Sequence, residues 1–419
     1  MRAALCRALR AEPHELGALA WAFAYFFLLL CSYYILRPVR DALAVEAGIE
    51  KLQWLFTATF AAMLALVPAF GWLCARLPRT RLLPVVYAFF ALNLVAFSVK
   101  LDATAFFIWL SVFNLFVVSV FWSFMSDLFS AAQAARLYGT IAAGGSCGAI
   151  AGPLIAATAI TPLGIHGLLL LSATLLSFSV LCIAMLGRWA RAHPRAGDPP
   201  PDAPIGGSIL AGVRAALSSP FLLGICGYLL CYTALSTALY FAQVDIVRDA
   251  VPDAGERTRL FASVDLVVNA LTLLVQLLAF ARLSMALGPT WMLAVMPVVS
   301  LVGFLGLGAA PVLGVLVAFG VVRRVGEFAI SKPARDALFT VVPREERYKA
   351  KNFIDTVIYR GGDALSGWLL GGVPALAFVA AAISAGWITL AFFLGGKMTA
   401  WIQEDVPRSA PLPRSRQEP

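Results

Sequence analysis

Long apolar stretches alternate with short polar ones along almost the whole chain. A helix needs about 20 apolar residues to cross the hydrocarbon core of a bilayer, and most of these stretches have about that length. The pattern therefore predicts twelve membrane-spanning helices. We expect them near residues 18–45, 52–75, 82–99, 104–128, 137–160, 165–187, 221–247, 259–282, 289–309, 311–340, 349–371 and 373–396.

Composition supports the same fold class. The chain is 61% hydrophobic and 13% charged, with a mean hydropathy of +0.85. A soluble domain carries about 25% charged residues, so an all-α integral membrane protein is predicted. The net charge of +9 does not indicate a nucleic-acid partner, because the arginines gather in the connections between apolar stretches.

A polar, proline-rich stretch divides the apolar stretches into two groups of six. We predict an N-terminal six-helix half at 1–187, a cytoplasmic linker at 188–220, a C-terminal six-helix half at 221–403 and a disordered tail at 404–419. Two six-helix halves around one linker resemble the layout of the major facilitator fold.

The basic residues also predict an orientation. They gather between the second and third helices, in the linker, and between the tenth and eleventh helices, whereas the turns on the other side at 160–166, 309–311 and 371–374 are nearly uncharged. By the positive-inside rule the basic side, with both termini, is cytoplasmic. We expect a multi-pass monomer in a bacterial inner (plasma) membrane.

One short motif occurs twice, at the ends of two apolar stretches. Residues 37–43 and 332–338 both read basic-Pro-x-Arg-Asp-Ala-Leu. Charges beside an apolar stretch are costly unless they meet something polar. The first helix runs outward and the tenth inward, so the copies are expected at opposite membrane faces, as two gates of an alternating-access cycle. The alternative is two helix ends whose arginines reach lipid headgroups.

Further charges lie within the predicted helices. Guanidinium groups suit phosphate or carboxylate, and the basic groups outnumber the acidic ones, so an anionic solute is favoured. The candidate substrate-binding residues are Arg37, Arg40, Arg323, Arg324, Lys332, Arg335, Lys351 and Arg360. The candidate gating or coupling residues are Asp41, Asp265, Asn269, Glu327, Asp336 and Asp355.

Depth in the membrane refines this prediction. Arg323 and Glu327 are four residues apart, so we expect them to share a helix face and pair. They follow the start of their helix by about 12 residues, or roughly 18 Å, close to the bilayer centre. A water-filled cavity is expected around the deepest groups, Arg323, Arg324, Glu327, Asp265 and Asn269. Three other groups are expected only to hold helices in register: Asp127, Gln276 and Asp363.

Small residues crowd the predicted fifth helix. Gly144, Gly145, Gly148 and Gly152 precede Pro153. Small residues allow close helix packing in lipid, which is the interpretation we adopt. A phosphate-binding loop is rejected, because such a loop needs a strand before its glycines.

Three sequence patches resemble the ATP/ADP translocases of plastids and intracellular bacteria, the nucleotide transporter family. The patches are residues 33–41 (YYILRPVRD), 121–124 (FWSF) and the region 332–355. The resemblance implies a twelve-helix antiporter in which residues such as Arg37, Arg40 and Lys351 engage nucleotide phosphates. The chain departs from that family in the fourth helix, where Leu110 and Asn114 occupy the region in which the exchangers carry an acidic residue. This departure puts ATP/ADP exchange in question.

The leading prediction is a secondary active transporter, an antiporter, of a phosphorylated or other anionic solute, with nucleotides as candidates. One alternative is a proton-coupled exporter of small organic compounds with Asp265 or Glu327 as proton carrier. Another is a non-transporting scaffold or sensor on a transporter fold. An enzyme is not expected, since the three histidines and seven cysteines show no metal-ligand spacing. No cofactor or metal is predicted.

Overall fold

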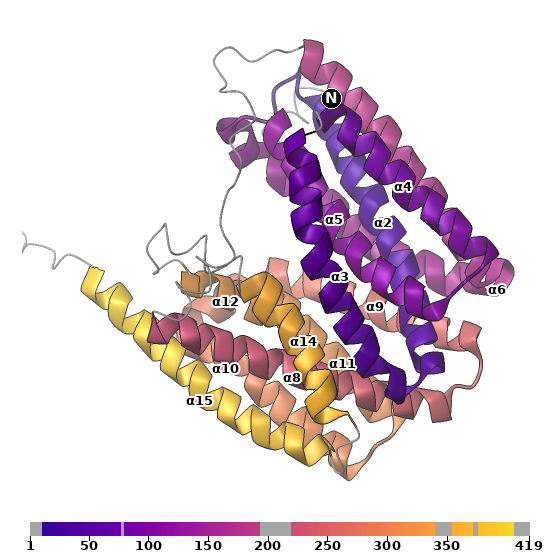
Figure 1. Cartoon of the computed structure of the whole chain (residues 1–419). Helices are drawn as coiled ribbons and strands as arrows, with labels where there is room; N and C mark the ends of the chain where they lie inside the picture. Colours follow the sequence, from indigo (N-terminus) through magenta and orange to yellow (C-terminus); the bar gives the residue numbers. More distant parts are fainter. Residues whose placement is uncertain (1–10, 77–78, 193–218, 340–353, 372–375, 406–419) are drawn as a thin grey trace, which may run out of the picture.

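The apolar stretches fold into helices packed in two bundles (Figure 1). A computed structural model describes the backbone of residues 11–76, 79–192, 219–339, 354–371 and 376–405. These ranges contain helices and turns and no strand. Seven of the described helices are long and apolar enough to cross a membrane. The predicted all-α membrane fold is therefore confirmed.

In the part of the chain that the structure describes, the first half contains five helical elements. They are α2 (Leu16–Ala47), α3 (Ile49–Arg76), α4 (Arg79–Val99), α5 (Ala103–Leu128) and α6 (Ala131–Ala192). The 62 residues of α6 form two helices joined at Gly164, whose φ of +64° lies in the left-handed region that favours glycine. The break falls between the fifth and sixth helices expected from the sequence.

The second half is more broken. Its elements are α8 (Pro220–Ala250), α9 (Ala254–Leu278), α10 (Phe280–Ala309), α11 (Leu313–Gly326), the π-helix η1 (Glu327–Ser331), α12 (Lys332–Leu338), the π-helix η3 (Ile354–Ile358), α14 (Tyr359–Leu370) and α15 (Leu376–Asp405). The expected tenth helix is thus α11, η1 and α12 in succession. Pro333 lacks an amide hydrogen and its ring crowds the carbonyl one turn earlier, which accounts for the widened π turn before it.

These elements are consistent with the twelve predicted segments. Among the described residues, α6 ends at Ala192 and α8 begins at Pro220. Most of the predicted linker and nearly all of the predicted tail lie outside the described residues, and the division into two halves, a linker and a tail stays a prediction.

Each half has its own hydrophobic core. Tyr25, Phe113 and Phe121 are fully buried in the first, and Tyr228 and Trp387 in the second. The last turns of α2 are an exception, because residues 42, 44 and 45 pack into the core of the second half. The end of α2 therefore anchors one half on the other.

The glycines of α6 lie directly against α2. A Cβ atom added to Gly152 would lie 2.7 Å from the Cys31 carbonyl oxygen and 2.7 Å from the Tyr34 Cβ atom. Gly144 and Gly148 likewise face the α2 backbone. The predicted close helix packing is confirmed.

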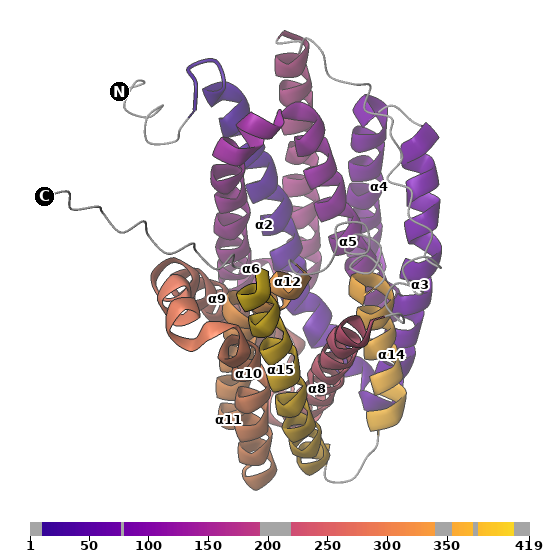
Figure 2. The same cartoon turned by 90° about the vertical axis from the view of Figure 1, so that its left-hand side faces the viewer.

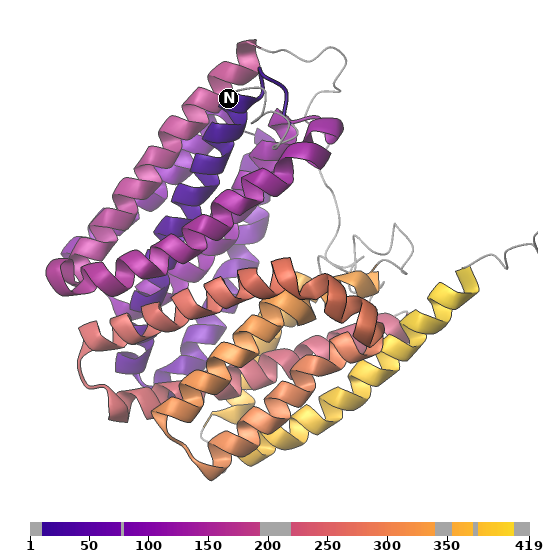
Figure 3. The ribbon, with the colours of Figure 1, turned by 180° about the vertical axis from the view of Figure 1, so that it is seen from behind.

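The two halves meet at one side of the molecule and diverge toward the other, as Figure 1 shows; Figure 2 looks at the side on which they diverge, and Figure 3 shows the same arrangement from behind. We call the side where α2 begins the terminal side and the opposite side the distal side. The contacts join α6 to α9, seen from behind in Figure 3, and α3 to α14. Near the distal end of α3, Trp368 Nε1 donates a hydrogen bond of 2.9 Å to Thr57 Oγ1, and the Trp368 ring lies edge-on to Trp54.

Candidate functional site

The two copies of the repeated motif lie in different halves of the molecule. Residues 37–43 belong to the last turns of α2, toward the distal side, and residues 332–338 form α12, which lies nearer the terminal side (Figure 1). Placement of the two copies at opposite membrane faces, and which side is cytoplasmic, stay predictions.

Arg37 and Arg324 share one carboxylate across the two halves. Arg37 Nε on α2 lies 3.8 Å from Asp265 Oδ2 on α9, and Arg324 Nη2 on α11 lies 2.5 Å from Asp265 Oδ1. The Asp265 side chain is 2% exposed. Two guanidinium groups on one buried carboxylate leave local positive charge in excess.

Arg40 and Asp41 form a second cluster near the end of α2. Arg40 donates to Asp41 Oδ1 from Nη2 at 2.7 Å and from Nε at 3.0 Å. Tyr240 on α8 donates its hydroxyl hydrogen to the same oxygen at 3.1 Å. The Arg40 guanidinium also lies 5.2 Å from the centre of the Phe107 ring. This cluster therefore joins α2, α5 and α8.

The prediction that Arg323 and Glu327 form an ion pair with each other is wrong. Arg323 instead donates to Ser236 Oγ at 2.8 Å and lies over the Tyr232 ring. Glu327, at the start of the π turn, lies 3.6 Å from Arg335 Nη1. The widened turn carries Glu327 toward Arg335, so the i,i+4 spacing assumed from the sequence does not decide the partner.

The water-filled cavity expected around the five deepest groups stays a prediction, because three of them are buried, whereas the Arg324 side chain is 22% exposed and Asn269 lines a cavity. Arg323 and Glu327 are each 5% exposed, and Asp265 is 2% exposed. Asn269 donates to the Ala149 carbonyl oxygen at 2.6 Å, which links α9 to α6. In this arrangement of the halves Arg323, Glu327 and Asp265 are enclosed by protein contacts.

A cavity of about 200 Å³ does lie between the halves, closer to α3 and α14. We call it the inter-half cavity. Its lining comes from both halves and consists of Arg40, Phe56, Thr59, Phe60, Phe107, Ser111, Ser236, Thr237, Tyr240, Tyr359, Arg360 and Asp363. The first half thus contributes Arg40 to the lining, and the second half contributes Arg360.

Some polar groups that line this cavity lack close hydrogen-bond or ion-pair partners. Arg360 Nη1 lies 3.7 Å from Asp363 Oδ2, a long ion pair, and the Arg360 side chain is 30% exposed. Thr59 Oγ1 is buried and has no hydrogen-bond partner in the described part of the chain. Arg323 reaches the cavity wall through Ser236. An entering polar group would find donors here.

The remaining candidates lie elsewhere. Lys332 is exposed and Asp336 is half-buried on α12. Lys351 lies outside the described residues, and Asp355 lies in η3 with its side chain not described. Gln276 and Asp363 were both expected only to hold helices in register. Gln276 donates to the Phe328 carbonyl oxygen at 3.1 Å and so links two helices, whereas Asp363 lines the inter-half cavity. The side chain of Asp127 is not described.

The sequence reasoning missed the uncharged lining of this cavity. Phe56, Phe107 and Tyr240 stand in apolar stretches and look like any aromatic residue of a membrane helix. A usable signal exists in Ser236, Thr237 and Tyr240, a run of hydroxyl side chains within one predicted helix. Hydroxyl groups in lipid need partners, so such a run indicates an inward face.

The sequence profile of the Major Facilitator Superfamily matches residues 22–247, more than half of the chain. The chain belongs to this superfamily. No curated protein matches it in sequence.

Solved structures of other transporters share the fold. A bacterial homologue of the human lysosomal transporter Spinster, inward-facing and unoccupied, aligns with a TM-score of 0.60 at 14% identity, covering 94% of this chain and 95% of that one. The nucleoside transporter NupG, solved as a point mutant, gives 0.63 at 14% identity, over 92% and 99% of the two chains. A bacterial homologue of the iron transporter ferroportin, inward-facing, gives 0.63 at 12% identity, over 91% and 98%. The chain is thus a multi-pass membrane transporter of this superfamily.

Proposed function

We propose that this transporter exchanges phosphorylated or other anionic solutes across the membrane by alternating access. The observation that carries the proposal is the inter-half cavity, to which each half contributes one arginine, Arg40 and Arg360. A solute bound by both guanidinium groups links the halves, so its arrival and departure can be coupled to their relative movement.

The charges around the cavity favour an anion. Asp41 holds Arg40 at 2.7 Å, but Asp363 holds Arg360 only at 3.7 Å, and Arg323 behind Ser236 has no carboxylate within 4 Å among the described residues. A phosphate or carboxylate can replace Asp363 on the Arg360 fork and gain a bidentate hydrogen bond. When the cavity is empty, Asp363 is the counter-charge of the partly exposed Arg360.

The aromatic wall favours a solute with a planar part. Phe56, Phe107, Tyr240 and Tyr359 surround the arginines. Aromatic faces stack on planar groups and on guanidinium groups. A nucleotide unites a planar base with phosphates, so it is our first candidate, in agreement with the sequence resemblance to the ATP/ADP translocases.

Alternating access requires the distal contacts to open. Asp265, Asn269 and Trp368 all make contacts between the halves in this arrangement. In the other arrangement we place closure at the terminal side, where Arg335 of the second motif copy lies. The proposal includes a bacterial inner membrane with the terminal side cytoplasmic, as the basic connections indicate.

The test is a counter-flow assay. The full chain is reconstituted in liposomes loaded with unlabelled ATP, ADP or phosphate, and uptake of labelled ATP is measured. Uptake that needs an internal anion supports exchange. If folded protein takes up neither ATP nor any member of a wider panel of anions under any loading condition, the proposal is wrong.

One observation favours a second candidate, proton-coupled export of small organic compounds. The Glu327 side chain is 5% exposed and its Oε2 has no hydrogen-bond partner in the described part of the chain. A buried carboxylate with one free oxygen can take up a proton when its ion pair with Arg335 opens. A pH-sensitive dye trapped in the same liposomes distinguishes the two: proton flux that accompanies transport and is lost in Glu327→Gln favours this candidate.

A further inference from the structure

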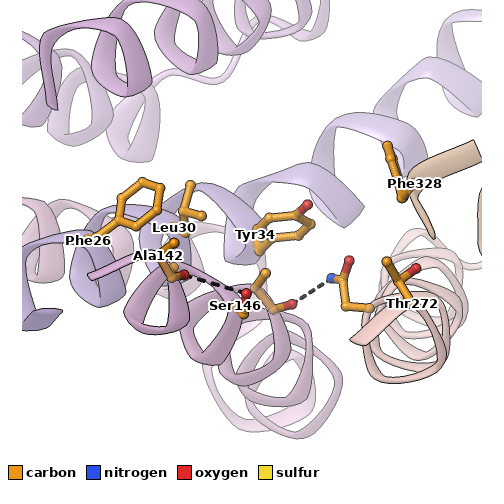
Figure 4. Close-up of a pocket in the computed structure, with 10 residues that line it drawn as sticks. Phe26, Leu30, Tyr34, Ala142, Ser146, Thr272 and Phe328 are labelled. Atoms are coloured by element: carbon orange, nitrogen blue, oxygen red, sulfur yellow. Dashed lines mark hydrogen bonds between the residues drawn. The ribbon is translucent and has the colours of Figure 1, made fainter. Parts of the chain in front are cut away.

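A second cavity, of about 230 Å³, lies between α2, α6, α9 and η1 (Figure 4). We call it the side pocket. Its walls include Phe26, Leu30, Tyr34, Ser146, Thr272 and Phe328. It shares no lining residue with the inter-half cavity, and the proposed exchange function leaves it unexplained.

The walls of the side pocket are apolar or uncharged. The hydroxyl of Ser146 donates within its own helix to the Ala142 carbonyl oxygen, and Asn269 donates to the Ala149 carbonyl oxygen, as the dashed lines in Figure 4 show. The rings of Phe26, Tyr34 and Phe328 supply much of the remaining surface. A ligand that fills these walls is mainly hydrocarbon.

A charged cluster lies near one end of the pocket, although none of the residues that line the pocket is charged. Arg37 follows Tyr34 by three residues, Asp265 precedes Asn269 by four, and Arg324 precedes Phe328 by four, so the same three helices carry the ion-pair cluster one turn beyond the pocket wall. The Arg37 guanidinium lies 5.9 Å from the centre of the Tyr34 ring. Two arginines on one carboxylate leave one positive charge unmatched at that end.

The helix α9, which forms one wall of the pocket with Asn269 and Thr272, exposes leucines on its opposite face. Leu274 is 51% exposed, Leu277 72% and Leu278 67%. In a membrane protein such a surface lies in hydrocarbon. The pocket is therefore separated from this apolar surface by the thickness of one helix.

We propose that the side pocket binds the hydrocarbon chain of an anionic amphiphile, whose phosphate or carboxylate lies at Arg37 and Arg324. The single chain lies against Leu30, Tyr34 and Phe328. The head group competes with Asp265 for the two guanidinium groups. This binding does not rest on the proposed exchange function, and the ligand can come from the bilayer or from solution.

The test is photo-crosslinking with a dodecyl phosphate that carries a diazirine on its chain, using the full chain in liposomes of phosphatidylcholine. We expect crosslinks in peptides that hold residues 26–34 or 142–149, and we expect excess unlabelled dodecyl phosphate to remove them. Inorganic phosphate and dodecanol, each having one half of the ligand, should compete at least about tenfold more weakly. Equal competition by either half overturns the proposal.

Ser146→Phe provides a variant that fills the pocket, and Cys147→Phe provides its matched control, because Cys147 is exposed and does not line the pocket. Crosslinking should fall about tenfold in Ser146→Phe and stay unchanged in Cys147→Phe. Equal crosslinking in the two variants overturns the proposal. If Ser146→Phe does not fold, as judged by gel filtration, Thr272→Leu replaces it, with loss of crosslinking as the same criterion.

The source of the ligand is decided by mass spectrometry of the lipids that purify with the protein. An acidic single-chain lipid enriched over the bulk lipid in wild type, and lost in Ser146→Phe, identifies the membrane as the source. Specific crosslinking without such enrichment identifies a soluble amphiphile. Both results support the assignment of the side pocket as the binding site. The assignment is wrong if either half of the ligand competes equally, or if Ser146→Phe and Cys147→Phe crosslink equally. Loss of ATP counter-flow would not affect it.

Discussion

Arg37 Nε on α2 lies 3.8 Å from Asp265 Oδ2 on α9, so a charge of the first half pairs with a buried carboxylate of the second half. The two residues lie far apart in sequence and on different bundles. The Asp265 side chain is 2% exposed and the Arg37 side chain 18% exposed, so the carboxylate depends on its two arginines for charge compensation. The pair therefore contributes to holding the distal side closed, together with Arg324 on the same carboxylate.

We predict that Asp265→Asn destabilises the protein, because it leaves Arg37 and Arg324 facing each other without a counter-charge. Removing one partner of a buried ion pair costs about 3–5 kcal/mol. Thermal unfolding of the purified protein should show a clearly lower Tm, and Arg37→Gln in the same chain should restore part of the loss. A double variant no more stable than Asp265→Asn would show that the two groups do not interact.

The distal hydrogen bond between Trp368 and Thr57 gives a second prediction. Trp368→Phe keeps most of the ring contact with Trp54 but removes the donor. One hydrogen bond is worth about 1 kcal/mol, which shifts a two-state equilibrium about fivefold toward the distally open arrangement. An impermeant thiol reagent applied from the distal side should then modify a Thr59→Cys probe in the inter-half cavity about fivefold faster.

Trp291→Phe is the matched control for that experiment, because Trp291 is 54% exposed and contacts Phe392 within the second half. It should leave the modification rate unchanged. The background from native cysteines is measured in the chain without Thr59→Cys. Equal rates in all variants would remove the assigned role of the Trp368–Thr57 contact.

Close packing of α2 on α6 gives a third prediction. Gly152→Ala places a Cβ atom 2.7 Å from the Cys31 carbonyl oxygen, so the two helices must separate. Overpacking of this kind costs about 1–3 kcal/mol. Gly139→Ala on the same helix is the control, because nothing lies within 4 Å of its added Cβ atom. A lower Tm is expected for the first variant alone, and equal Tm values for both would contradict the packing.

Glu15, just before α2, gives a prediction on pH. Burial raises the pKa of the Glu15 carboxyl, but hydrogen bonds from the Glu12 amide, Gln133 and Arg136 together lower it by more, so its pKa lies below the ordinary 4.5. A lowered pKa means that the carboxylate stabilises the fold above pH 4.5 and that this contribution is lost as the pH falls through the folded-state pKa.

Glu15→Gln should therefore lower the Tm at pH 7, while at a pH below the folded-state pKa the variant and wild type should unfold at nearly the same temperature. Glu256→Gln, at an exposed carboxylate on α9, controls for the change of net charge. A Tm difference between Glu15→Gln and wild type that is independent of pH would contradict the ionic contribution.

The sequence predicted the fold well because bilayer thickness imposes helix length, and Gly164 and Gly288 mark the breaks within α6 and α10. It also singled out Arg37, Arg40 and Asp265, because charged residues stand out in apolar surroundings, and their functional roles stay predictions. The sequence did not predict the partners of these charges, because the pairing of Arg37 with Asp265 depends on how one bundle is rotated against the other. The inter-half cavity was missed for the same reason, and the π turn at Glu327 misdirected the pairing of Arg323.

The central claim is that an anion binds between Arg40 of one half and Arg360 of the other. The most direct measurement compares anion counter-flow in liposomes for wild type, Arg40→Gln, Arg360→Gln and Arg259→Gln, the last at an exposed arginine of α9 away from the cavity. We predict that Arg40→Gln and Arg360→Gln each reduce exchange to the level of empty liposomes while Arg259→Gln exchanges like wild type. Wild-type exchange in Arg40→Gln and Arg360→Gln would contradict the claim.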